Sequence, residues 1–476
     1  MLRKIDEFRW EIPREGAMRV PGLIIASEKL ISKIDSERVV EQVRNVATLP
    51  GIVGHSLAMP DAHWGYGACV GGVAAFDSDG GIVSPGIAGY DLSCGIRLLS
   101  TGLQAAQVKA DLPRLMDALF AAVPSGVGIG GPLRVNAKEM RGVFRHGAKW
   151  AVSRGFGEAA DLDACEDGGF LPDAGEDVPS ERAVERGNDQ LGTLGSGNHF
   201  LEVQEVDEIF DPKVAETFGL SRGQLVLMIH TGSRGCGYQV CTDYLQIIRK
   251  ASHRFGIKLP DAQLASAPVE SPEAQEYLAA MRAASNFARA NRQVITQRAR
   301  EAMEQTLQRS PRDLDVRVVY DVSHNLIKKE THVVEGKEKK LFVHRKGATR
   351  AFPPGHLDIP ERYREVGQPV LLPGSMGTHS YVLVGTEQAM KETWGTTAHG
   401  AGRRMSRTQA AKQTNGGELL RELLKQGVHV RTDSLRGLAE EAPFAYKDVS
   451  EVVEACHRSG ISRKIARMRP IGVVKG

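Results

Sequence analysis

The sequence has few cysteines, no long apolar run and almost no charge imbalance. Its six cysteines are scattered over 476 residues, which excludes a disulfide framework and favours a reducing compartment. The longest apolar stretches are strand-sized, well short of the roughly 20 residues of a membrane helix. Lys and Arg number 61 against 58 for Asp and Glu, a formal charge of +3. A polybasic nucleic-acid binder is therefore not expected, although a local basic groove remains compatible with this charge.

Two common nucleotide-binding signatures are also missing. The chain has no Walker A motif and no strand–Gly-x-Gly-x-x-Gly–helix unit, so neither a P-loop nor a Rossmann site is expected. Residues 1–10 alternate charged and apolar side chains without the apolar core of a secretory signal. We therefore expect a cytoplasmic protein without a membrane segment.

Glycine, in contrast, is abundant, with 52 residues, which indicates many tight turns or close backbone approaches to a ligand. No internal repeat or Pro/Ser-rich linker divides the chain. The predicted fold is mixed α+β, a single large domain over residues 1–476 with central sheets flanked by helices around a deep cleft. Residues 155–190 are acidic and aperiodic, which favours a mobile loop. A polar cap followed by Pro and Glu predicts a long helix over 271–308.

Three predicted strands run directly into polar segments. The strand at 224–229 leads into His230, the strand at 316–320 leads toward His324, and the strand at 370–372 leads into Pro373. Strands that end in Gly, Ser and His deliver polar groups to a shared rim, where ligands are commonly bound.

Five residues form a candidate metal site: Asp91, Cys94, His199, His230 and His324. The carboxylate and the thiol lie three residues apart in a Gly-rich turn, and a thiolate can bridge two ions. The donor set suits a borderline divalent ion and leaves Zn, Mn and Fe open. Each residue taken alone is more often structural, since a buried cysteine commonly packs as a small apolar side chain and a histidine beside Gly and Ser is commonly a turn residue. The strand-end context that the three histidines share favours the joint metal site.

Two neighbouring residues allow weaker interpretations. His63 could be a further ligand, although a structural turn residue is the simpler interpretation. Asp61, two residues earlier, is a candidate acid or base.

A second candidate site begins at His399. Gly400 and Gly402 follow it and would let backbone N–H groups approach a phosphate, and arginines at 403, 404 and 407 could neutralise phosphate charge. A neutral imidazole can attack phosphorus and form a covalent intermediate. A Gly-rich helix start with solvated arginines explains the same composition. Glu202 is a natural acceptor for the N1–H and amino edge of guanine.

Eight sequence blocks together resemble one known family. They include Asp61-Ala-His-Trp-Gly-Tyr-Gly67, Gly89-Tyr-Asp-Leu-Ser-Cys-Gly95, Gly195-Ser-Gly-Asn-His-Phe-Leu-Glu202, His230-Thr-Gly-Ser-Arg-Gly235, Val322-Ser-His-Asn325, His344-Arg-Lys-Gly-Ala-Thr-Arg350, Pro373-Gly-Ser-Met-Gly377 and His399-Gly-Ala-Gly402. In this order they resemble the RtcB family of RNA-splicing ligases, from about residue 1 to the closing segment 470–476.

The resemblance implies a GTP- and Mn²⁺-dependent ligase. It would join an RNA 2′,3′-cyclic phosphate or 3′-phosphate end to a 5′-hydroxyl end, in tRNA splicing or RNA repair. Cys94 would bridge two Mn²⁺ ions, with His230 and His324 completing one site and Asp91 and His199 the other. His399 would carry GMP. The implied nucleotide-binding residues are Asn198, His199, Phe200, Leu201, Glu202, His324, Asn325, Pro373, Gly374, Ser375, Met376, Ser380, His399, Gly400, Ala401, Gly402, Tyr446 and Lys475.

Some expectations concern partners and the RNA path. The candidate RNA-contacting residues are Asp61, Arg234, Arg345, Arg350 and Arg407, with Arg289 and Arg292 of the long helix. The resemblance implies archease as a candidate activator protein. We expect the protein to be a monomer. His379 departs from the family pattern, in which a small residue is expected, and it could alter nucleotide preference or simply point away.

Two other functions compete with ligation. A dinuclear metal-dependent phosphoesterase acting on cyclic-phosphate ends would need the metal ligands without His399 or Lys475. A non-catalytic RNA-binding protein would need a strongly basic surface, which the overall charge supports little.

Overall fold

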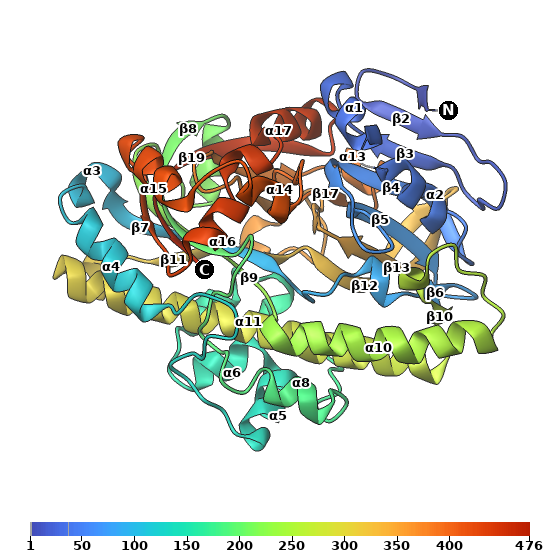
Figure 1. Ribbon diagram of the computed structural model, residues 1–476, viewed down its shortest axis with the longest axis horizontal. Helices are drawn as coiled ribbons and strands as arrows, with labels where there is room; N and C mark the ends of the chain where they lie inside the picture. Colours follow the sequence, from blue (N-terminus) through green and yellow to red (C-terminus); the bar gives the residue numbers. More distant parts are fainter. Residues whose placement is uncertain (1, 37) are drawn as a thin grey trace.

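The computed structural model describes residues 2–36 and 38–476, and it confirms the mixed α+β class. Two large sheets lie side by side with helices around them, and each sheet combines strands that are far apart in sequence (Figure 1). The first sheet has seven strands in the order β1-β2-β3-β4-β5-β13-β12. Their bounds are Arg3–Lys4, Arg9–Ile12, Gly22–Ile25, Ile52–His63, Val70–Asp77, Lys337–Lys346 and Asn325–Val334.

The second sheet has eight strands and carries most of the predicted site. Its order is β11-β7-β9-β8-β19-β16-β15, with β18 added alongside β19. The bounds are Arg317–Ser323, Gly95–Gln104, Gln224–Thr231, Phe200–Ile209, Ser462–Lys475, Ser380–Gly385 and Pro369–Leu372, and His429–Arg431 for β18. Two short pairs complete the strands: β6 (Ile82–Val83) with β10 (Ala267–Pro268), and β14 (Ala348–Arg350) with β17 (Thr396–Ala398).

Alternation along the strands gives the second sheet two apolar faces. In β7, Leu98 packs with Val382 and Leu438 on one side, whereas Leu99 packs on the other side with Leu115 and with residues of the long helix. Because successive strand side chains point to opposite faces, the same strand serves two cores.

The long helix α11 spans Pro272–Leu307, within the predicted range. Ser271 caps it by accepting a hydrogen bond from the backbone N–H of Ala274. Its central residues 283–296 are buried all round rather than along a single stripe. The reason is visible in Figure 1, where α11 runs under the sheet with α5 and α6 below it and α10 and α4 beside it. A helix covered on every side needs no polar face.

The remaining helices cover the faces and edges of the sheets. They are α1 (Glu28–Ser36), α2 (Val39–Val46), α3 (Ala105–Val108), α4 (Leu112–Ala122), α5 (Ala137–His146), α6 (Ala148–Ser153), α7 (Ala159–Leu162), α8 (Glu181–Glu185), α9 (Pro212–Thr217), α10 (Arg234–Arg254), α12 (Pro311–Leu314), α13 (Glu387–Glu392), α14 (Arg407–Ala411), α15 (Gly416–Lys425), α16 (Leu435–Glu440) and α17 (Val449–Arg458).

The segment 155–190, predicted to be a mobile acidic loop, has local structure. It contains α7, a 3₁₀ turn at Glu166–Gly169 and α8. Asp161 and Glu166 are buried, and Asp161 receives two hydrogen bonds from Arg300 of α11 at 2.7 and 2.8 Å. Its acidic residues therefore bind basic side chains of the core. Mobility of the segment stays a prediction.

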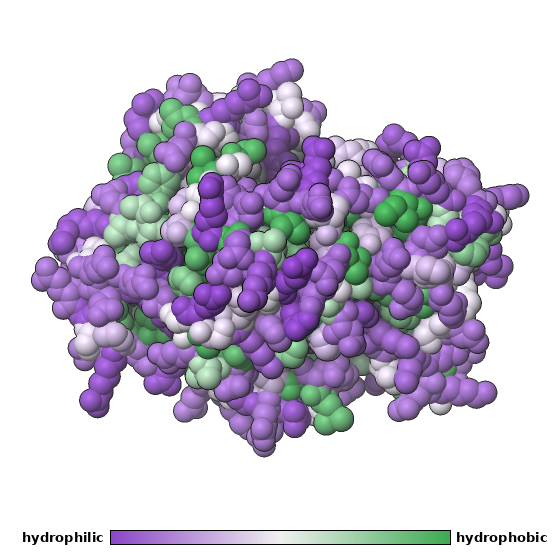
Figure 2. Space-filling view, turned by 90° about the horizontal axis from the view of Figure 1, so that it is seen from below, coloured by the Kyte–Doolittle hydropathy of each residue, from purple (hydrophilic) through white to green (hydrophobic). Residues whose placement is uncertain are grey.

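The surface seen from below is mainly hydrophilic, with apolar side chains in small separate groups (Figure 2). In the part of the chain that the structure describes, no helix is both long and apolar enough to cross a bilayer.

Candidate metal and nucleotide site

Four predicted metal ligands meet at one edge of the eight-stranded sheet. Cys94 directly precedes β7, His199 directly precedes β8, and His230 lies near the end of β9. His324 follows β11. Because β7 and β8 are both antiparallel to β9, and β11 is antiparallel to β7, the starts of two strands and the ends of the other two coincide. Strand register therefore assembles ligands from four chain regions.

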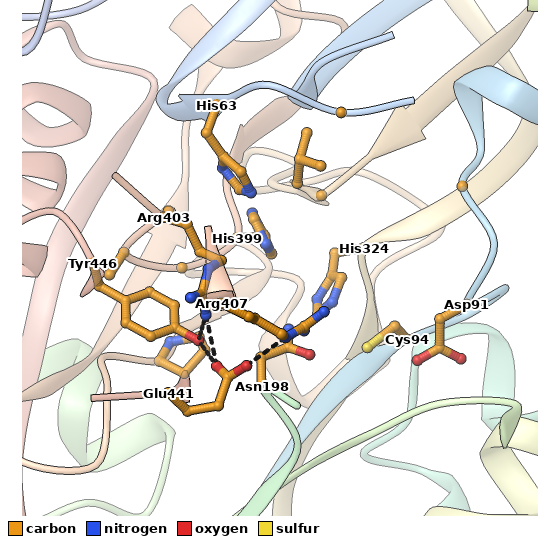
Figure 3. A pocket seen from close by; sticks show the side chains of 18 of the residues that line it. His63, Asp91, Cys94, Asn198, His324, His399, Arg403, Arg407, Glu441 and Tyr446 are labelled. Atoms are coloured by element: carbon orange, nitrogen blue, oxygen red, sulfur yellow. Dashed lines mark hydrogen bonds and ion pairs between the residues drawn. The ribbon is translucent and has the colours of Figure 1, made fainter. Parts of the chain in front are cut away.

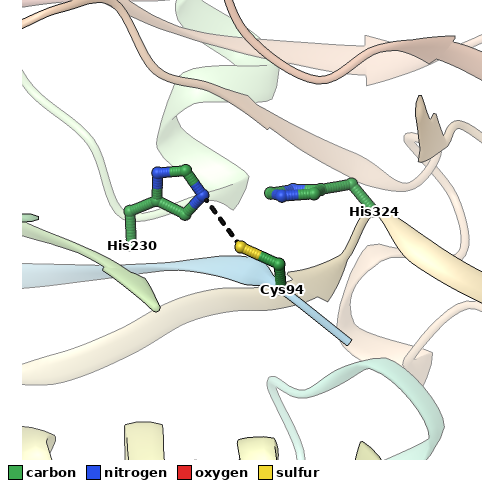
Figure 4. A group of neighbouring side chains, drawn as sticks. All are labelled: Cys94, His230 and His324. Atoms are coloured by element: carbon green, nitrogen blue, oxygen red, sulfur yellow. Dashed lines mark hydrogen bonds between the residues drawn. The ribbon is translucent and has the colours of Figure 1, made fainter. Parts of the chain in front are cut away.

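The ligand atoms form two overlapping groups. Cys94 belongs to both, first with His230 and His324 and second with Asp91 and His199, and within each group the ligand atoms lie within 4.8 Å of one another. The Cys94 Sγ is 3.3 Å from Nε2 of His199 and 3.3 Å from Nε2 of His230. Figure 4 shows the sulfur between the two imidazoles of the first group. One thiol shared by two donor sets is the arrangement that a sulfur-bridged ion pair requires.

Neighbouring groups fix the orientation of these ligands. His199 Nδ1 is 3.0 Å from the carbonyl oxygen of Leu194, which holds the ring with Nε2 toward Cys94 Sγ at 3.3 Å and Asp91 Oδ2 at 2.9 Å. Arg292 of α11 donates hydrogen bonds of 3.0 Å to the carbonyl oxygens of Ser93 and Thr231. These two residues adjoin Cys94 and His230, so the guanidinium group holds the backbone on both sides of the cluster.

Burial sets the protonation of the cluster. Burial lowers the pKa of His230 and of His324 well below the ordinary histidine value, so both imidazoles are neutral and have a free lone pair. Burial and the charge of Asp91 raise the pKa of the Cys94 thiol well above its ordinary value. The thiol therefore keeps its proton until a cation that binds beside it displaces that proton.

His399, the predicted nucleophile, stands next to this cluster. It follows β17, and its ring centroid is 4.8 Å from that of His324. Asp61 of β4 is fully buried, and its Oδ2 accepts hydrogen bonds from His399 Nδ1 at 2.6 Å and from the backbone N–H groups of His399 and Gly400 at 3.0 and 3.2 Å. With the proton held on Nδ1, the lone pair lies on Nε2.

The prediction that Asp61 contacts RNA is corrected by this geometry. Burial acts to raise the pKa of Asp61, but the charge of His399 and its hydrogen bonds lower it overall, so the carboxylate stays ionised against the imidazole. The alternative interpretation of Asp61 as an acid or base stays compatible with its position, and its long-range partner is 338 residues away.

A cavity of about 810 Å³ joins the metal cluster to the C-terminal residues. Figure 3 shows Asp91 and Cys94 at one end, Glu441 and Tyr446 at the other, and His399 and His324 between them. Among the predicted nucleotide-binding residues, those that line it are Asn198, Phe200, His324, Asn325, Pro373, Gly374, Ser375, Met376, His399, Gly400, Ala401, Gly402, Tyr446 and Lys475. Most of the predicted nucleotide-binding residues therefore line this cavity, and their binding of a nucleotide stays a prediction.

Glu202 and Ser380 lie just behind this wall. Gln204 Nε2 donates to Glu202 Oε2 at 2.6 Å and to Ser380 Oγ at 3.1 Å. Burial raises the pKa of Glu202 to about 8, and its Oε1 is buried without a hydrogen-bond partner. Burial lowers the pKa of Lys475 to about 8. An orphaned buried carboxyl oxygen is a ready acceptor for a ligand N–H.

Leu201 is placed differently from the expectation, whereas His379 lies outside the cavity lining, as one of its two alternatives allowed. Leu201 is fully buried in the apolar cluster that includes Leu115 and Ile229. Strand alternation sends it to the face opposite Phe200 and Glu202, so its side chain does not reach the cavity. His379 lies 3.4 Å from Asp207 Oδ2 and does not line the cavity.

Most arginines proposed for an RNA groove are structural, which corrects that prediction. Arg345 and Arg350 are almost fully buried and bind Glu330 at 2.6 Å and Glu166 at 2.9 Å. Arg289 and Arg292 are equally buried, bound to Asp167 at 2.7 Å and Asp321 at 2.8 Å. Glu166 and Asp167 come from a distant segment, so sequence spacing could not reveal their pairs. Glu330 lies only 15 residues from Arg345, on the paired strand, and its pairing depends on strand register.

The two remaining candidates have different positions. Arg234 is half-buried and donates a hydrogen bond of 3.1 Å to Thr193 Oγ1 behind the cluster. Arg407 lines the cavity, and its Nε is 2.7 Å from Glu441 Oε1.

Glu441 is a site residue that the sequence analysis missed. It is 1% exposed and accepts hydrogen bonds from Arg403 Nη1 at 2.9 Å, from Arg407 and from the Tyr446 hydroxyl. The Arg403 guanidinium also lies over the Tyr446 ring, 5.0 Å from its centroid. Glu441 is over thirty residues from its arginines and carries no local motif, so no sequence signal pointed to it.

The family follows from comparison with known proteins. A family model described as "tRNA-splicing ligase RtcB" matches residues 42–476. The chain belongs to the RtcB family. The RtcB relative from Thermococcus kodakarensis, named tRNA-splicing ligase RtcB, is 52% identical over 476 residues, covering 100% of this chain and 99% of the relative. The RtcB relative from Mycobacterium tuberculosis, named RNA-splicing ligase RtcB, is 52% identical over 438 residues, covering 91% of this chain and 100% of the relative.

Proposed function

We infer that this protein is an RNA ligase of tRNA splicing or RNA repair. It joins an RNA 3′-phosphate or 2′,3′-cyclic phosphate end to a 5′-hydroxyl end and uses GTP to activate the phosphate. The observation that carries the proposal is the position of His399, whose free Nε2 shares one cavity with the thiol-centred donor sets. The orphaned carboxyl oxygen of Glu202 lies just behind the wall of this cavity. Membership in the RtcB family supports it.

The donor sets fit two divalent cations, and we propose Mn²⁺. His230 and His324 would hold one ion and Asp91 and His199 the other, with Cys94 between them. The ions supply charge stabilisation for the oxygens that enter and leave phosphorus. Soft and borderline donors are compatible with Zn²⁺ as well, so the identity of the metal is a finer part of the proposal.

The guanine base is assigned to Glu202. Its unpartnered Oε1 can accept from guanine N1–H or the exocyclic amine, whereas adenine presents no N1–H. Arg403, Arg407 and Lys475 supply positive charge to the phosphates at this end of the cavity.

His399 performs the first chemical step. Asp61 holds the Nδ1 proton, and Nε2 attacks the α-phosphorus of GTP. A P–N bond forms, the bond to the β-phosphate oxygen breaks, and pyrophosphate leaves. Asp61 also balances the positive charge that the imidazole gains on bonding to phosphorus.

The second and third steps transfer this activation to RNA. A cyclic phosphate is first opened by water to a 3′-phosphate. A 3′-phosphate oxygen attacks the GMP phosphorus, breaking the P–N bond and restoring the imidazole. The 5′-hydroxyl then attacks the phosphorus of the activated 3′-phosphate, and a phosphodiester forms. The bond between this phosphorus and the oxygen that links it to GMP breaks, and GMP leaves with that oxygen.

Purified protein with labelled GTP and Mn²⁺ tests the first step. We expect a covalent GMP adduct that is acid-labile and alkali-stable, as a phosphoramidate is, and that disappears in His399→Ala. RNA with a cyclic-phosphate end and a 5′-hydroxyl end should be joined only when GTP is present. Opening of the cyclic phosphate with neither adduct nor joining would instead identify a phosphoesterase. A monomeric state, a cytoplasmic location and activation by archease stay predictions.

A further inference from the structure

Four aromatic side chains form a continuous row at the mouth of the cavity. Trp64 and Tyr66 follow β4, Tyr90 precedes Asp91, and Tyr238 lies on α10. All four line the cavity. The ring centroids of Trp64 and Tyr66 are 5.5 Å apart, those of Tyr66 and Tyr90 6.1 Å, and those of Tyr90 and Tyr238 5.1 Å. We call these four residues the aromatic row.

The aromatic row is unusually accessible. Trp64, Tyr66 and Tyr238 are 51%, 60% and 48% exposed. Among residues 2–36 and 38–476, five Phe, Tyr or Trp side chains are at least 36% exposed: Trp64, Tyr66, Phe210, Tyr238 and Phe255. Three of these five gather at one cavity mouth. Burying such rings stabilises a fold by about 1.5–3 kcal/mol each. Leaving three of them in water at one place therefore indicates a surface that is covered when a ligand binds.

Positive charge accompanies the row. The Arg186 guanidinium lies over the Tyr238 ring, 5.3 Å from its centroid, and is itself exposed. Tyr90 is anchored by a hydrogen bond from its hydroxyl to Gln263 Oε1 at 3.0 Å. Fixed aromatic faces beside an accessible cation are what proteins use to hold single-stranded nucleic acid, where bases stack on rings and cations meet phosphates.

The row also has a defined position relative to the chemistry. Tyr90 is the residue before Asp91, so this end of the cavity adjoins the second metal donor set. The nucleotide end, with Glu441 and Tyr446, lies on the other side of His324 and His399 (Figure 3). An RNA strand whose terminal phosphate or hydroxyl reaches the metal cluster can leave the cavity over the aromatic row.

We propose that Trp64, Tyr66, Tyr90 and Tyr238 form a stacking platform for the unpaired bases of the RNA next to the ends that are joined. This inference rests on the proposed ligase function. Stacking accepts any base, so the platform binds RNA ends without selecting a sequence. Arg186 contributes charge for the backbone at the outer end of the row.

Direct RNA binding tests the platform. The dissociation constant of single-stranded RNA with a 3′-phosphate, and of RNA with a 5′-hydroxyl, is measured for the holoenzyme with Mn²⁺ and without GTP. Tyr238→Ala and Trp64→Ala should each weaken binding of one of these RNAs about 5- to 100-fold, since stacking contributes about 1–3 kcal/mol per base. Tyr238→Phe and Trp64→Phe keep a ring and should stay within about twofold. Phe255→Ala, an equally exposed ring outside the cavity, is the matched control.

Abasic RNAs separate stacking from a general structural defect. Removing the base that stacks on Tyr238 should weaken wild-type binding by the same factor as Tyr238→Ala, and the variant should lose nothing more on that RNA. The ratio of the two proteins' affinities should also stay constant between 50 and 200 mM salt, because stacking releases no counterions. An equal loss on intact RNA and on every abasic RNA would overturn the platform.

The wild-type ligation assay keeps this proposal separate from the proposed function. If the wild type neither forms the GMP adduct nor joins RNA, the ligase function fails and the platform with it. If the wild type joins RNA while both alanine variants bind RNA normally, the platform alone is wrong. Normal RNA binding together with a changed oligomeric state in the alanine variants would assign the row to a protein contact instead.

Discussion

The two ends of the cavity are built on opposite electrostatic plans. At the metal end, buried imidazoles and a thiol have no basic side chain bonded to their ligand atoms, and their pKa shifts keep them neutral. At the other end, Arg403 and Arg407 are already bound to the buried carboxylate of Glu441. The first end gains its charge balance when cations arrive. The second has one carboxylate against two guanidinium groups and Lys475, so it is positive beforehand and has to share its arginines with an arriving phosphate.

The two ends also differ in how the chain assembles them. The metal ligands sit at coinciding ends of hydrogen-bonded strands, so sheet register positions them. The nucleotide end joins the segment after His399 to Glu441, which follows α16, and to Lys475 on β19. Removing a group from one end should therefore leave the other end intact, and each prediction below tests this independence.

The largest effect is expected from Cys94→Ala at the metal end. Loss of the shared sulfur should reduce the bound metal from two ions per chain to one or none. Ligation should fall by at least about 1,000-fold, because several kcal/mol of charge stabilisation disappear. Metal analysis and end-joining kinetics measure both. Cys456→Ala removes another buried thiol as a control, and two ions retained in Cys94→Ala would refute the bridge.

A smaller effect is expected from Asp61→Asn, which acts where the two ends meet. The amide can donate to Nδ1, which then keeps its lone pair while Nε2 carries the proton. Because the attacking nitrogen is then protonated, formation of the GMP adduct should slow about 100-fold or more. Sealing of an RNA with a chemically installed 3′-guanylyl group bypasses this nitrogen and should fall much less. Equal losses in the two assays would mean that Asp61 supports the whole site rather than the nucleophile.

Glu202→Gln should affect nucleotide choice and leave the metal end intact. Because burial raises the pKa of Glu202 to about 8, its carboxyl is mainly neutral at pH 7. A neutral hydrogen bond contributes roughly 0.5–1.5 kcal/mol, so the preference for GTP over ATP should drop about 2- to 10-fold. Competition in the adduct assay measures the preference, and metal content measures the other end. Glu208→Gln on the same strand is the control. A loss of metal in Glu202→Gln would show that the two ends are coupled.

The smallest effect on joining is expected from Arg345→Met, which lies outside both ends. Glu330 would lose its bidentate partner, so the free energy of unfolding should fall by about 3–5 kcal/mol. RNA affinity and ligation by the folded protein should stay within about twofold. Denaturant unfolding and RNA binding test this, and adding Glu330→Leu should restore part of the stability. A tenfold loss of RNA affinity would return Arg345 to the RNA path.

The sequence predicted the site better than it predicted the charges around it. His199, His230 and His324 were found because each borders a short apolar strand, a pattern that survives in one dimension. Asp61 and Arg345 were assigned to RNA contacts although both are buried. Asp61 finds its partner 338 residues away, and Arg345 finds Glu330 on the paired strand β12, a match that depends on strand register. Leu201 shows the limit at single-residue scale, since a motif names neighbours while strand alternation separates their faces.

The position of β19 has a consequence for how the protein is made. It follows every other strand in the chain, yet it lies inside the eight-stranded sheet, between β8 and β16, and it carries Lys475 to the cavity. A nascent chain leaving the ribosome therefore has an open slot in this sheet until residues 462–475 emerge. Until then two strand edges are unpaired and the nucleotide end lacks a cation. An unfinished copy should therefore neither consume GTP nor seal RNA, and it should be more prone to aggregate than the finished one.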